Sequence, residues 1–267
     1  MKPDISEFSY GFALVDELIH GDGWPLTAVP IYPSLRDEGQ LGYDVELQRN
    51  GIPVFLQFKL ADCMVRNYAF EVREGYLTVP FYRIHLRPIR KSKQHELLLK
   101  LEATGREVYY VAPAFHLPTE LNDAYLKKQM RNRSRFFRPS VIGPLDDEPH
   151  MVAFQLPGDF VVRSNPVKKG GALDGKGFER EILGAFRQKR REALSDESLR
   201  RLGHSMMEML PEKLDESDTG KEEAFASISQ NLKPLGQVAY LARTFFGCEL
   251  IAVTEKTEQA ATKHSGG

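Results

Sequence analysis

Hydrophobic positions near the start of the chain recur first at the spacing of a helix and then at the spacing of strands. In residues 6–20 they fall three or four residues apart, so we predict a helix that buries the stripe Phe8, Phe12, Val15 and Ile19, widened by Ala13, Leu14 and Leu18. A short apolar run at residues 27–35, interrupted by prolines, indicates a strand. Residues 42–62 read GYDVELQRNGIPVFLQFKLAD, in which two alternating runs flank an Arg-Asn-Gly turn signal. This pattern predicts a β-hairpin.

The middle of the chain alternates between helical and strand patterns. A serine before the periodic run and a glycine after it mark a helix at residues 92–104, and a basic helix is expected at residues 119–133. Strand patterns precede, separate and follow these helices, at residues 80–88, 107–112 and 150–163. This order predicts an α/β fold with a mixed sheet flanked by helices.

A glycine-rich stretch at residues 164–177 has the composition of a linker or loop. We therefore expect one domain at residues 1–165 and a mainly helical accessory region at residues 166–254, which closes with a strand at CELIAVTE. Helical patterns in that region fall at residues 178–194, 198–210 and 225–246. The tail, residues 255–267, has little to bury, so we expect it to be disordered.

Composition and charge narrow the classes of function. With 267 residues, of which 42% are hydrophobic and 27% charged, the chain can bury a substantial core. No apolar run approaches the roughly 18 residues needed to span a bilayer, so we expect a cytoplasmic protein with no membrane partner. The net charge of −1 means that any nucleic-acid surface must be a local patch. Cys63 and Cys248 lack metal-site spacing, and we interpret them as buried thiols.

The second strand of the expected hairpin places two polar side chains on one face. In PVFLQFKLA, Gln57 and Lys59 share one parity, whereas Leu56, Phe58 and Leu60 share the other. A solvated strand face would explain this pair without any function. However, Asp44 lies on the neighbouring strand and Glu17 on the first helix, so four polar side chains can meet at one edge of the sheet.

Gly42 and Asp44, followed across a turn by Gln57 and Lys59, resemble the motif of the PD-(D/E)XK nuclease superfamily. The similarity is to its Mrr-like and Holliday-junction-resolvase-like branch, in which Gln-x-Lys replaces Glu-x-Lys. The superfamily core of helix, three strands, helix and strand also resembles the pattern in the first half of this chain. The resemblance implies a restriction-endonuclease-like fold and a metal-dependent endonuclease that hydrolyses phosphodiester bonds of DNA.

The resemblance also implies a catalytic set of Asp44, Gln57, Lys59 and Glu17. A hard cation, Mg²⁺ or Mn²⁺, would be bound by side-chain oxygens of Asp44, Gln57 and Glu17 and by the backbone carbonyl of Phe58. Lys59 would orient the attacking water or stabilise the developing negative charge. Alternatives for the helix carboxylate remain open: Glu7, Glu38 and Glu46.

The expected basic helix and its C-terminal extension carry a row of cations followed by Phe136 and Phe137. These cations are Lys127, Lys128, Arg131, Arg133, Arg135 and Arg138. A basic surface with aromatic residues suits a nucleic-acid backbone, so we predict DNA binding here, with a solvated helix face as the equal alternative. The histidines lack metal-ligand spacing and are interpreted as surface or structural residues: His85, His95, His116 and His150.

Three functional hypotheses follow. The first is a Mg²⁺-dependent DNA endonuclease within a bacterial anti-phage defence or DNA-processing system, a role that rests on the resemblance alone. Other subunits of a defence complex and a second copy of the chain would be its protein partners. The second is a non-catalytic nuclease-like subunit that binds nucleic acid or a partner. The third is an α/β interaction protein in which Gln57 and Lys59 face solvent; metal binding separates the first hypothesis from the other two.

Overall fold

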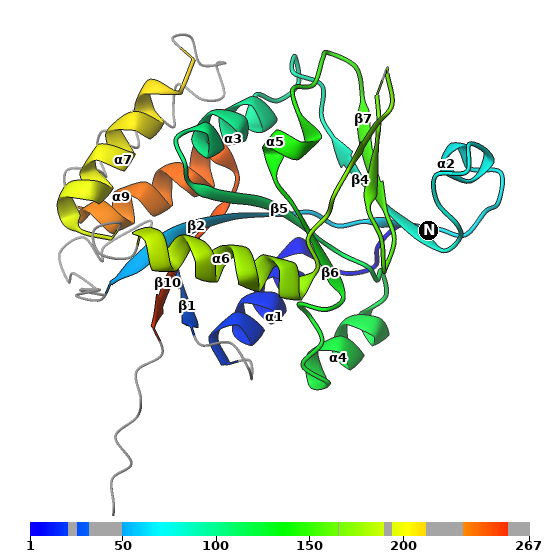
Figure 1. The fold of residues 1–267 in the computed structure, drawn as a ribbon, viewed down its shortest axis with the longest axis horizontal. Helices are drawn as coiled ribbons and strands as arrows, with labels where there is room; N and C mark the ends of the chain where they lie inside the picture. Colours follow the sequence, from blue (N-terminus) through cyan, green and yellow to red (C-terminus); the bar gives the residue numbers. More distant parts are fainter. Residues whose placement is uncertain (21–25, 32–49, 165, 190–193, 212–231, 256–267) are drawn as a thin grey trace, which may run out of the picture.

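Two five-stranded β-sheets form the framework of the protein in the computed structural model (Figure 1). The structure describes residues 1–20, 26–31, 50–164, 166–189, 194–211 and 232–255. No helix among these residues is long and apolar enough to cross a membrane.

Sheet A has the strand order β1-β10-β2-β5-β6. Its strands are β1 (Leu26–Ile31), β2 (Gly51–Phe58), β5 (Glu107–Pro113), β6 (Ser134–Phe137) and β10 (Glu249–Glu255). Strands β2 and β5 are parallel, and the other neighbours are antiparallel, so the sheet is mixed. Helix α3 (Gln94–Ala103) lies on the connection from β2 to β5, as a parallel pair requires a crossover.

Sheet B is antiparallel throughout and packs beside sheet A. Its strands in spatial order are β3 (Asp62–Met64), β4 (Phe81–Leu86), β7 (His150–Phe154), β8 (Phe160–Arg163) and β9 (Lys168–Gly170). The short helix α2 (Phe70–Arg73) connects β3 to β4, and α5 (Pro139–Ile142) follows β6. Sheet B begins three residues after Lys59, so it lies next to the end of β2.

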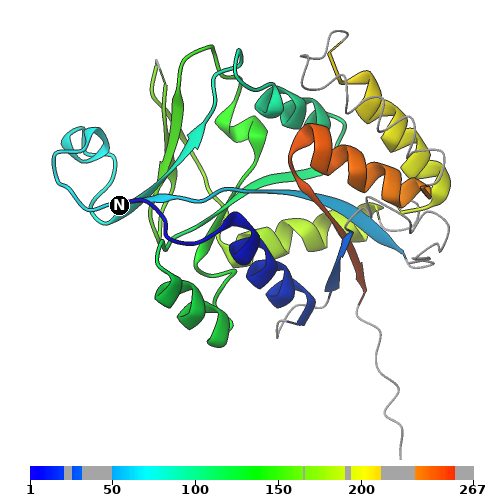
Figure 2. The same cartoon turned by 180° about the vertical axis from the view of Figure 1, so that it is seen from behind.

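Helices cover both faces of sheet A (Figures 1 and 2). One face contacts α1 (Glu7–His20), α4 (Pro118–Leu126) and α6 (Gly175–Lys189). The other faces α3, α7 (Asp196–Glu208), α9 (Pro234–Leu241) and the π-helical turn η2 (Ala242–Phe246). The α/β fold with a mixed sheet flanked by helices is confirmed.

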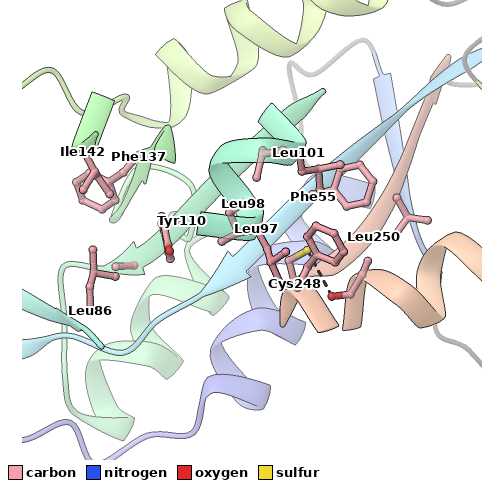
Figure 3. Close-up of a cluster of buried hydrophobic side chains, with 14 of the residues drawn as sticks. Phe55, Leu86, Leu97, Leu98, Leu101, Tyr110, Phe137, Ile142, Cys248 and Leu250 are labelled. Atoms are coloured by element: carbon pink, nitrogen blue, oxygen red, sulfur yellow. Dashed lines mark hydrogen bonds between the residues drawn. The ribbon is translucent and has the colours of Figure 1, made fainter. Parts of the chain in front are cut away.

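The alternation of β2 explains why both faces are apolar. Val54 and Leu56 belong to the cluster under α1 and α6, whereas Phe55 belongs to the cluster under α3 and α9. Figure 3 shows Phe55 in that second cluster, with Leu98 from α3 and Leu250 from β10 nearby. A strand buried on both faces reads as a continuous apolar run, which is the pattern that β2 has.

Helix α1 forms where the pattern predicts it, but only part of the predicted stripe is buried. Leu14, Val15 and Leu18 are buried as expected, whereas Phe8 and Phe12 are 73% and 57% exposed. Tyr10, which the predicted stripe did not include, is buried because it packs edge-on against the ring of Phe58, with 5.8 Å between the ring centroids. The prediction was therefore wrong for the first two turns of the helix.

The expected boundary at residue 165 does not separate two cores. Strand β10 lies between β1 and β2, and α6, α7 and α9 bury their apolar faces on sheet A. The glycine-rich stretch contains β9 and the start of α6 and is therefore not a linker. Gly175 is required because a Cβ there would lie 2.8 Å from the carbonyl oxygen of Arg131. The tail predicted to be disordered falls beyond Glu255, outside the described residues.

The basic helix ends earlier than predicted. Helix α4 stops at Leu126, and Lys128 adopts a positive φ of 52°, which breaks the helical path. Residues 134–137 then form β6, antiparallel to β5. The row of cations therefore follows a turn and a strand and does not line one helix.

Candidate functional site

The carboxyl end of β2 brings Gln57, Phe58 and Lys59 to one edge of sheet A. The backbone N–H of Lys59 donates to the carbonyl of Val111 at 2.9 Å, which extends the pairing with β5 by one residue. Gln57 is 3% exposed and points to the face of α3, whereas Phe58 points to the face of α1. Ligands bind at the carboxyl ends of parallel strands in many α/β folds, so this edge is the natural place for a site.

Gln57 has a polar end without a partner. Its Oε1 atom is buried and accepts no hydrogen bond from any described residue. The amides of Gln57 and Gln94 flank Gly247, where a Cβ would overlap the Gln94 amide and lie 3.6 Å from Nε2 of Gln57. Since a buried unpaired acceptor costs about 1–3 kcal/mol, a bound cation or water at Oε1 would remove this penalty.

Lys59 follows Gln57 on the same face and is influenced by one carboxylate and one arginine. Burial lowers its pKa, the carboxylate of Glu7 acts in the opposite direction, and the charge of Arg87 lowers the pKa further. Neither Lys59 nor Arg87 forms an ion pair within the described ranges. Lys59 is therefore held by its backbone and by packing, and its ammonium group is available to a ligand.

Glu7 reaches this edge from the start of α1. Gly11, one turn later, lies so close to β2 that a Cβ there would be 3.1 Å from the ring of Phe58. This contact positions the first turn of α1 over the end of β2. Glu7 is exposed and lines a pocket of about 210 Å³ together with Phe58, Arg243 and Glu249, which we call the acidic pocket.

The acidic pocket contains a second carboxylate. Burial raises the pKa of Glu249, and Arg243, whose Nε lies 3.5 Å from Oε1 of Glu249, opposes that shift. The two acids come from α1 and β10 and are remote in sequence. The pocket therefore offers oxygen ligands at the end of β2 on the α1 face of the sheet.

A second pocket, of about 50 Å³, opens on the α3 face of the same edge. It is lined by Lys59, His85 and Arg87 together with Ser92 and Gln94, and we call it the cationic pocket. Its remaining walls are the buried side chains of Leu86, His95 and Tyr110.

Glu17 does not join Gln57 and Lys59. It lies on the opposite face of sheet A, 5% exposed, and accepts hydrogen bonds from the backbone N–H of Met130 at 2.6 Å and from Nε of Arg131 at 2.9 Å. Arg131 also pairs with Glu179 of α6. Glu17 is thus engaged in a buried ion pair that joins α1 to the segment after α4, which corrects its expected position at the metal.

The predicted nucleic-acid contacts are also dispersed. Arg131 and Arg135 are buried, at 9% and 4% exposure, and Arg133 pairs with Glu120 while its guanidinium lies over the ring of Phe115. Lys127 pairs with Asp123 at 2.6 Å, and Lys128 lies in the turn after α4. Buried, paired arginines are structural, so these residues do not form one exposed basic face.

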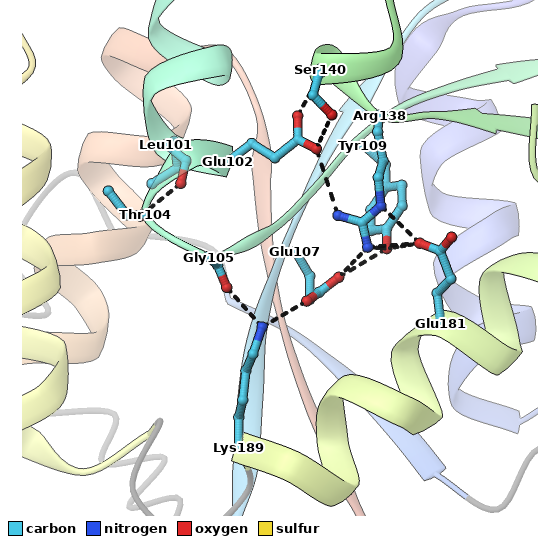
Figure 4. A network of polar contacts seen from close by, with 10 residues as sticks. All are labelled: Leu101, Glu102, Thr104, Gly105, Glu107, Tyr109, Arg138, Ser140, Glu181 and Lys189. Atoms are coloured by element: carbon cyan, nitrogen blue, oxygen red, sulfur yellow. Dashed lines mark hydrogen bonds and ion pairs between the residues drawn. The ribbon is translucent and has the colours of Figure 1, made fainter. Parts of the chain in front are cut away.

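Arg138 shows this structural role most clearly (Figure 4). Its guanidinium pairs with Glu107 of β5 and with Glu181 of α6, both at 2.7 Å, and Lys189 reaches Glu107 from the end of α6 at 3.0 Å. These contacts join α6 to the start of β5, at the opposite end of that strand from the candidate site. Arg138 therefore joins elements of the fold and does not present a surface.

Three candidate ligands lie outside the described residues: Asp44, Glu38 and Glu46. Within the described ranges, no group of three or more His, Cys, Asp or Glu residues could hold a metal ion. The oxygen donors that the structure does bring to the edge are Gln57, Glu7 and Glu249, with the backbone of Phe58 between the two pockets.

Several residues of this edge escaped the sequence analysis. Gln94 and Glu249 carry no motif, and His85 was interpreted as a surface or structural residue. His85 and Arg87 alternate on β4 and its extension, but an alternating pattern does not reveal which strand lies beside Lys59. Only the pairing of sheet B and its position beside β2 bring these side chains together.

Comparison with protein-family models, with curated proteins and with solved structures found no match for this chain. The interpretation of the site therefore rests on its geometry.

His95, at the floor of the cationic pocket, should make stability depend on pH. Its Nε2 lies 2.8 Å from the carbonyl oxygen of Gly143, and because a carbonyl can only accept, Nε2 carries the proton and donates. The other ring nitrogen, Nδ1, therefore accepts from the hydroxyl of Tyr110 at 3.0 Å. Burial lowers the pKa of His95, the bond to Gly143 opposes this, and the charges of His150 and Lys168 lower the pKa further. His95 is therefore neutral in the folded protein.

Because the folded pKa lies below the unfolded value of about 6.5, the unfolded chain takes up this proton first as the pH falls. The contribution of neutral His95 to the free energy of unfolding is fully present above the unfolded pKa. It is lost on acidification, and the free energy of unfolding then falls by at most about 1.4 kcal/mol per pH unit. In urea unfolding between pH 7 and 5, the free energy of unfolding should therefore fall more steeply for the unmodified protein than for His95→Gln. Parallel pH profiles for the two proteins would contradict this.

Proposed function

We propose that this chain is a metal-dependent endonuclease that hydrolyses phosphodiester bonds of DNA. The observation that supports this best is the arrangement at the end of β2. There, the unpartnered buried oxygen of Gln57 and the ammonium of Lys59 lie on the α3 face, and the carboxylate-lined pocket that includes Glu7 opens on the α1 face of the same strand end. An oxygen-donor set beside a cation suits the hydrolysis of a negatively charged ester.

The order of elements supports the proposal as well. Helix α1, strands β1 and β2, helix α3 and strand β5 occur in the order of the PD-(D/E)XK core that the motif resembles, with β2 and β5 parallel, although that core has three strands before its second helix and only two described strands of sheet A precede α3. Strand β10, between β1 and β2, departs from a consecutive arrangement of strands. We treat membership of the superfamily as part of the proposal.

The residues at this edge fit a hard divalent cation such as Mg²⁺ or Mn²⁺. Oε1 of Gln57, the carbonyl of Phe58 and the carboxylate of Glu7 would hold it, together with Asp44 if the resemblance extends to that residue. When bound, the cation supplies charge neutralisation and a more acidic water. In this proposal Glu7 takes the role first given to Glu17, because Glu7 acts on Lys59 whereas Glu17 is paired with Arg131.

Lys59 provides the positive charge in the reaction. Its ammonium group would donate hydrogen bonds to a non-bridging phosphate oxygen and stabilise the charge that accumulates there. Partial burial excludes water from one side of this group, which strengthens its electrostatic effect. The same proposal includes a cytoplasmic location, a role in anti-phage defence with partner subunits and a homo-oligomeric state. The two free cysteines suit the reducing conditions of the cytoplasm.

The second candidate is a non-catalytic subunit that binds nucleic acid. The observation that favours it is the cationic pocket, which suits a phosphate whether or not hydrolysis follows.

Cleavage and metal binding by the purified full chain test the proposal. Plasmid and single-stranded DNA should be nicked or cut with Mg²⁺ or Mn²⁺ and remain intact with EDTA, and calorimetry should detect the metal. Gln57→Leu keeps the size of the side chain but removes the amide oxygen, so metal affinity and cleavage should fall together. Thermal stability should not fall, because the change deletes an unpartnered buried acceptor. Absence of both cleavage and metal binding in the unmodified protein would select the second candidate.

A further inference from the structure

The cationic pocket concentrates positive charge in a small space. Lys59, His85 and Arg87 line it, and no carboxylate of a described residue does. The carboxylate of Glu7, which lines the acidic pocket, acts favourably on the charge of Lys59, whereas Arg87 acts unfavourably on it, and an anion in the pocket would offset the repulsion between the two cations. Among described residues, Lys59 and Arg87 lack ion-pair partners that would already do so.

The fold holds His85 in a defined orientation. Its Nε2 lies 3.1 Å from Oδ2 of Asp62 on the neighbouring strand β3, and Lys2 donates to the same oxygen at 2.8 Å. Burial raises the pKa of Asp62, but hydrogen bonds from Lys2 and His85 outweigh it and the net pKa is lowered. The charged carboxylate accepts a hydrogen bond from Nε2–H and so fixes the orientation of the imidazole.

The size and polarity of the pocket limit its ligand. Its volume of about 50 Å³ exceeds the roughly 30 Å³ of one water but is too small for a nucleoside. Ser92 and Gln94 add neutral donors to the ammonium of Lys59 and the guanidinium of Arg87. A compact oxyanion with several acceptor oxygens satisfies this set of donors.

We propose that Lys59, His85 and Arg87 form a subsite for one phosphate group of a nucleic acid, next to the phosphate that would be hydrolysed. This inference rests on the proposed function for its substrate class. The phosphate is either internal to the strand or at its 5′ end, because both present the same oxygens. His85 and Arg87 would fix the strand on the α3 face, and Lys59 would lie between their phosphate and the phosphate at the cation, which Gln57, Glu7 and the carbonyl of Phe58 would hold at the end of β2.

Binding in EDTA tests the subsite without cleavage. Fluorescence anisotropy would measure the affinity of the full chain for a labelled oligonucleotide over a range of salt concentrations, with inorganic phosphate as competitor. Arg87→Ala should lower affinity about tenfold, as for one charge-assisted hydrogen bond, and reduce the salt slope by about one. It should also weaken competition by phosphate. His85→Gln should lower affinity in the same direction and serves as a second variant if Arg87→Ala fails to fold.

Arg90→Ala is the matched control. Arg90 is an exposed arginine three residues further along that pairs with Asp147 and does not line the pocket, so its removal should leave the affinity within about twofold. Tighter binding of a 5′-phosphorylated than of a 5′-hydroxyl oligonucleotide, lost in Arg87→Ala, would assign a terminal phosphate. Equal binding of the two would assign an internal one.

Two results would overturn the subsite: equal affinity and salt slope for Arg87→Ala and the unmodified protein, or no oligonucleotide binding at all. The proposed function fails independently. If the protein cleaves DNA but Arg87→Ala has no effect, the proposed nuclease activity stands and the proposed subsite is wrong. If the protein binds phosphate through Arg87 but never cleaves DNA, the subsite stands and the nuclease activity is wrong.

Discussion

Replacing Lys59 with alanine is expected to slow metal-dependent DNA cleavage by at least about 100-fold. Losing one group that stabilises developing charge typically costs a factor of about 100 to 1,000 in rate. The free energy of unfolding should change little, because Lys59 makes no ion pair with a described residue and its burial disfavours its charge. Single-turnover rates at saturating DNA measure the chemical step separately from weaker binding through the cationic pocket.

Lys100→Ala is the control for loss of a positive charge. Lys100 lies half-exposed on α3 and pairs with Glu96, so its replacement should leave the cleavage rate within about twofold. If Lys59→Ala cleaved as fast as Lys100→Ala, the reaction would have to occur elsewhere in the protein or in a contaminant.

Replacing Glu17 with alanine is expected to destabilise the protein by about 3–5 kcal/mol, the usual effect of removing one member of a buried ion pair. Its carboxylate accepts from two backbone N–H groups, of Met130 and Arg131, and from the Arg131 guanidinium. Without Glu17, both backbone N–H groups would lose this acceptor, and Arg131 would keep only its remaining contacts, among them Glu179. Urea unfolding at pH 7 measures the loss directly.

Glu7→Ala is the matched control on the same helix and should give the opposite pattern. Glu7 is exposed in the first turn of α1, where an acid contributes only about 0.3–1 kcal/mol through the helix dipole. Its removal should therefore leave the fold stable but weaken metal binding and cleavage. If Glu17→Ala were stable but inactive and Glu7→Ala were fully active, Glu17 and not Glu7 would be the metal ligand.

Local patterns predicted the elements that form the frame of the site. Helical spacing identified α1 and α3, and alternating or apolar runs identified β2 and β5, because these patterns reflect the burial of one face or of both. The same alternation placed Gln57 and Lys59 on one side of β2. These features depend on residues within about ten positions of one another, and so they are visible in the sequence.

The side of each helix that faces the sheet depended on long-range contacts. The apolar residues of α1 span a face wider than the sheet covers, and packing of Tyr10 on Phe58 turned Phe8 and Phe12 outward while Leu14, Val15 and Leu18 stayed buried. This rotation placed Glu7 at the edge of the sheet. It also left Glu17 beside Arg131, since the two acids lie on different sides and at different ends of the helix.

The amino-acid sequence by itself determined the α/β class, the main helices and strands of the first half and the pair Gln57 and Lys59. Only the tertiary structure decided that β10 enters sheet A, that residues 134–137 form a strand and that His85 and Arg87 stand beside Lys59. The physical reason is that strand pairing joins segments far apart in the chain, here β2 with β10. A period of two residues records which face a side chain takes but not which strand lies next to it.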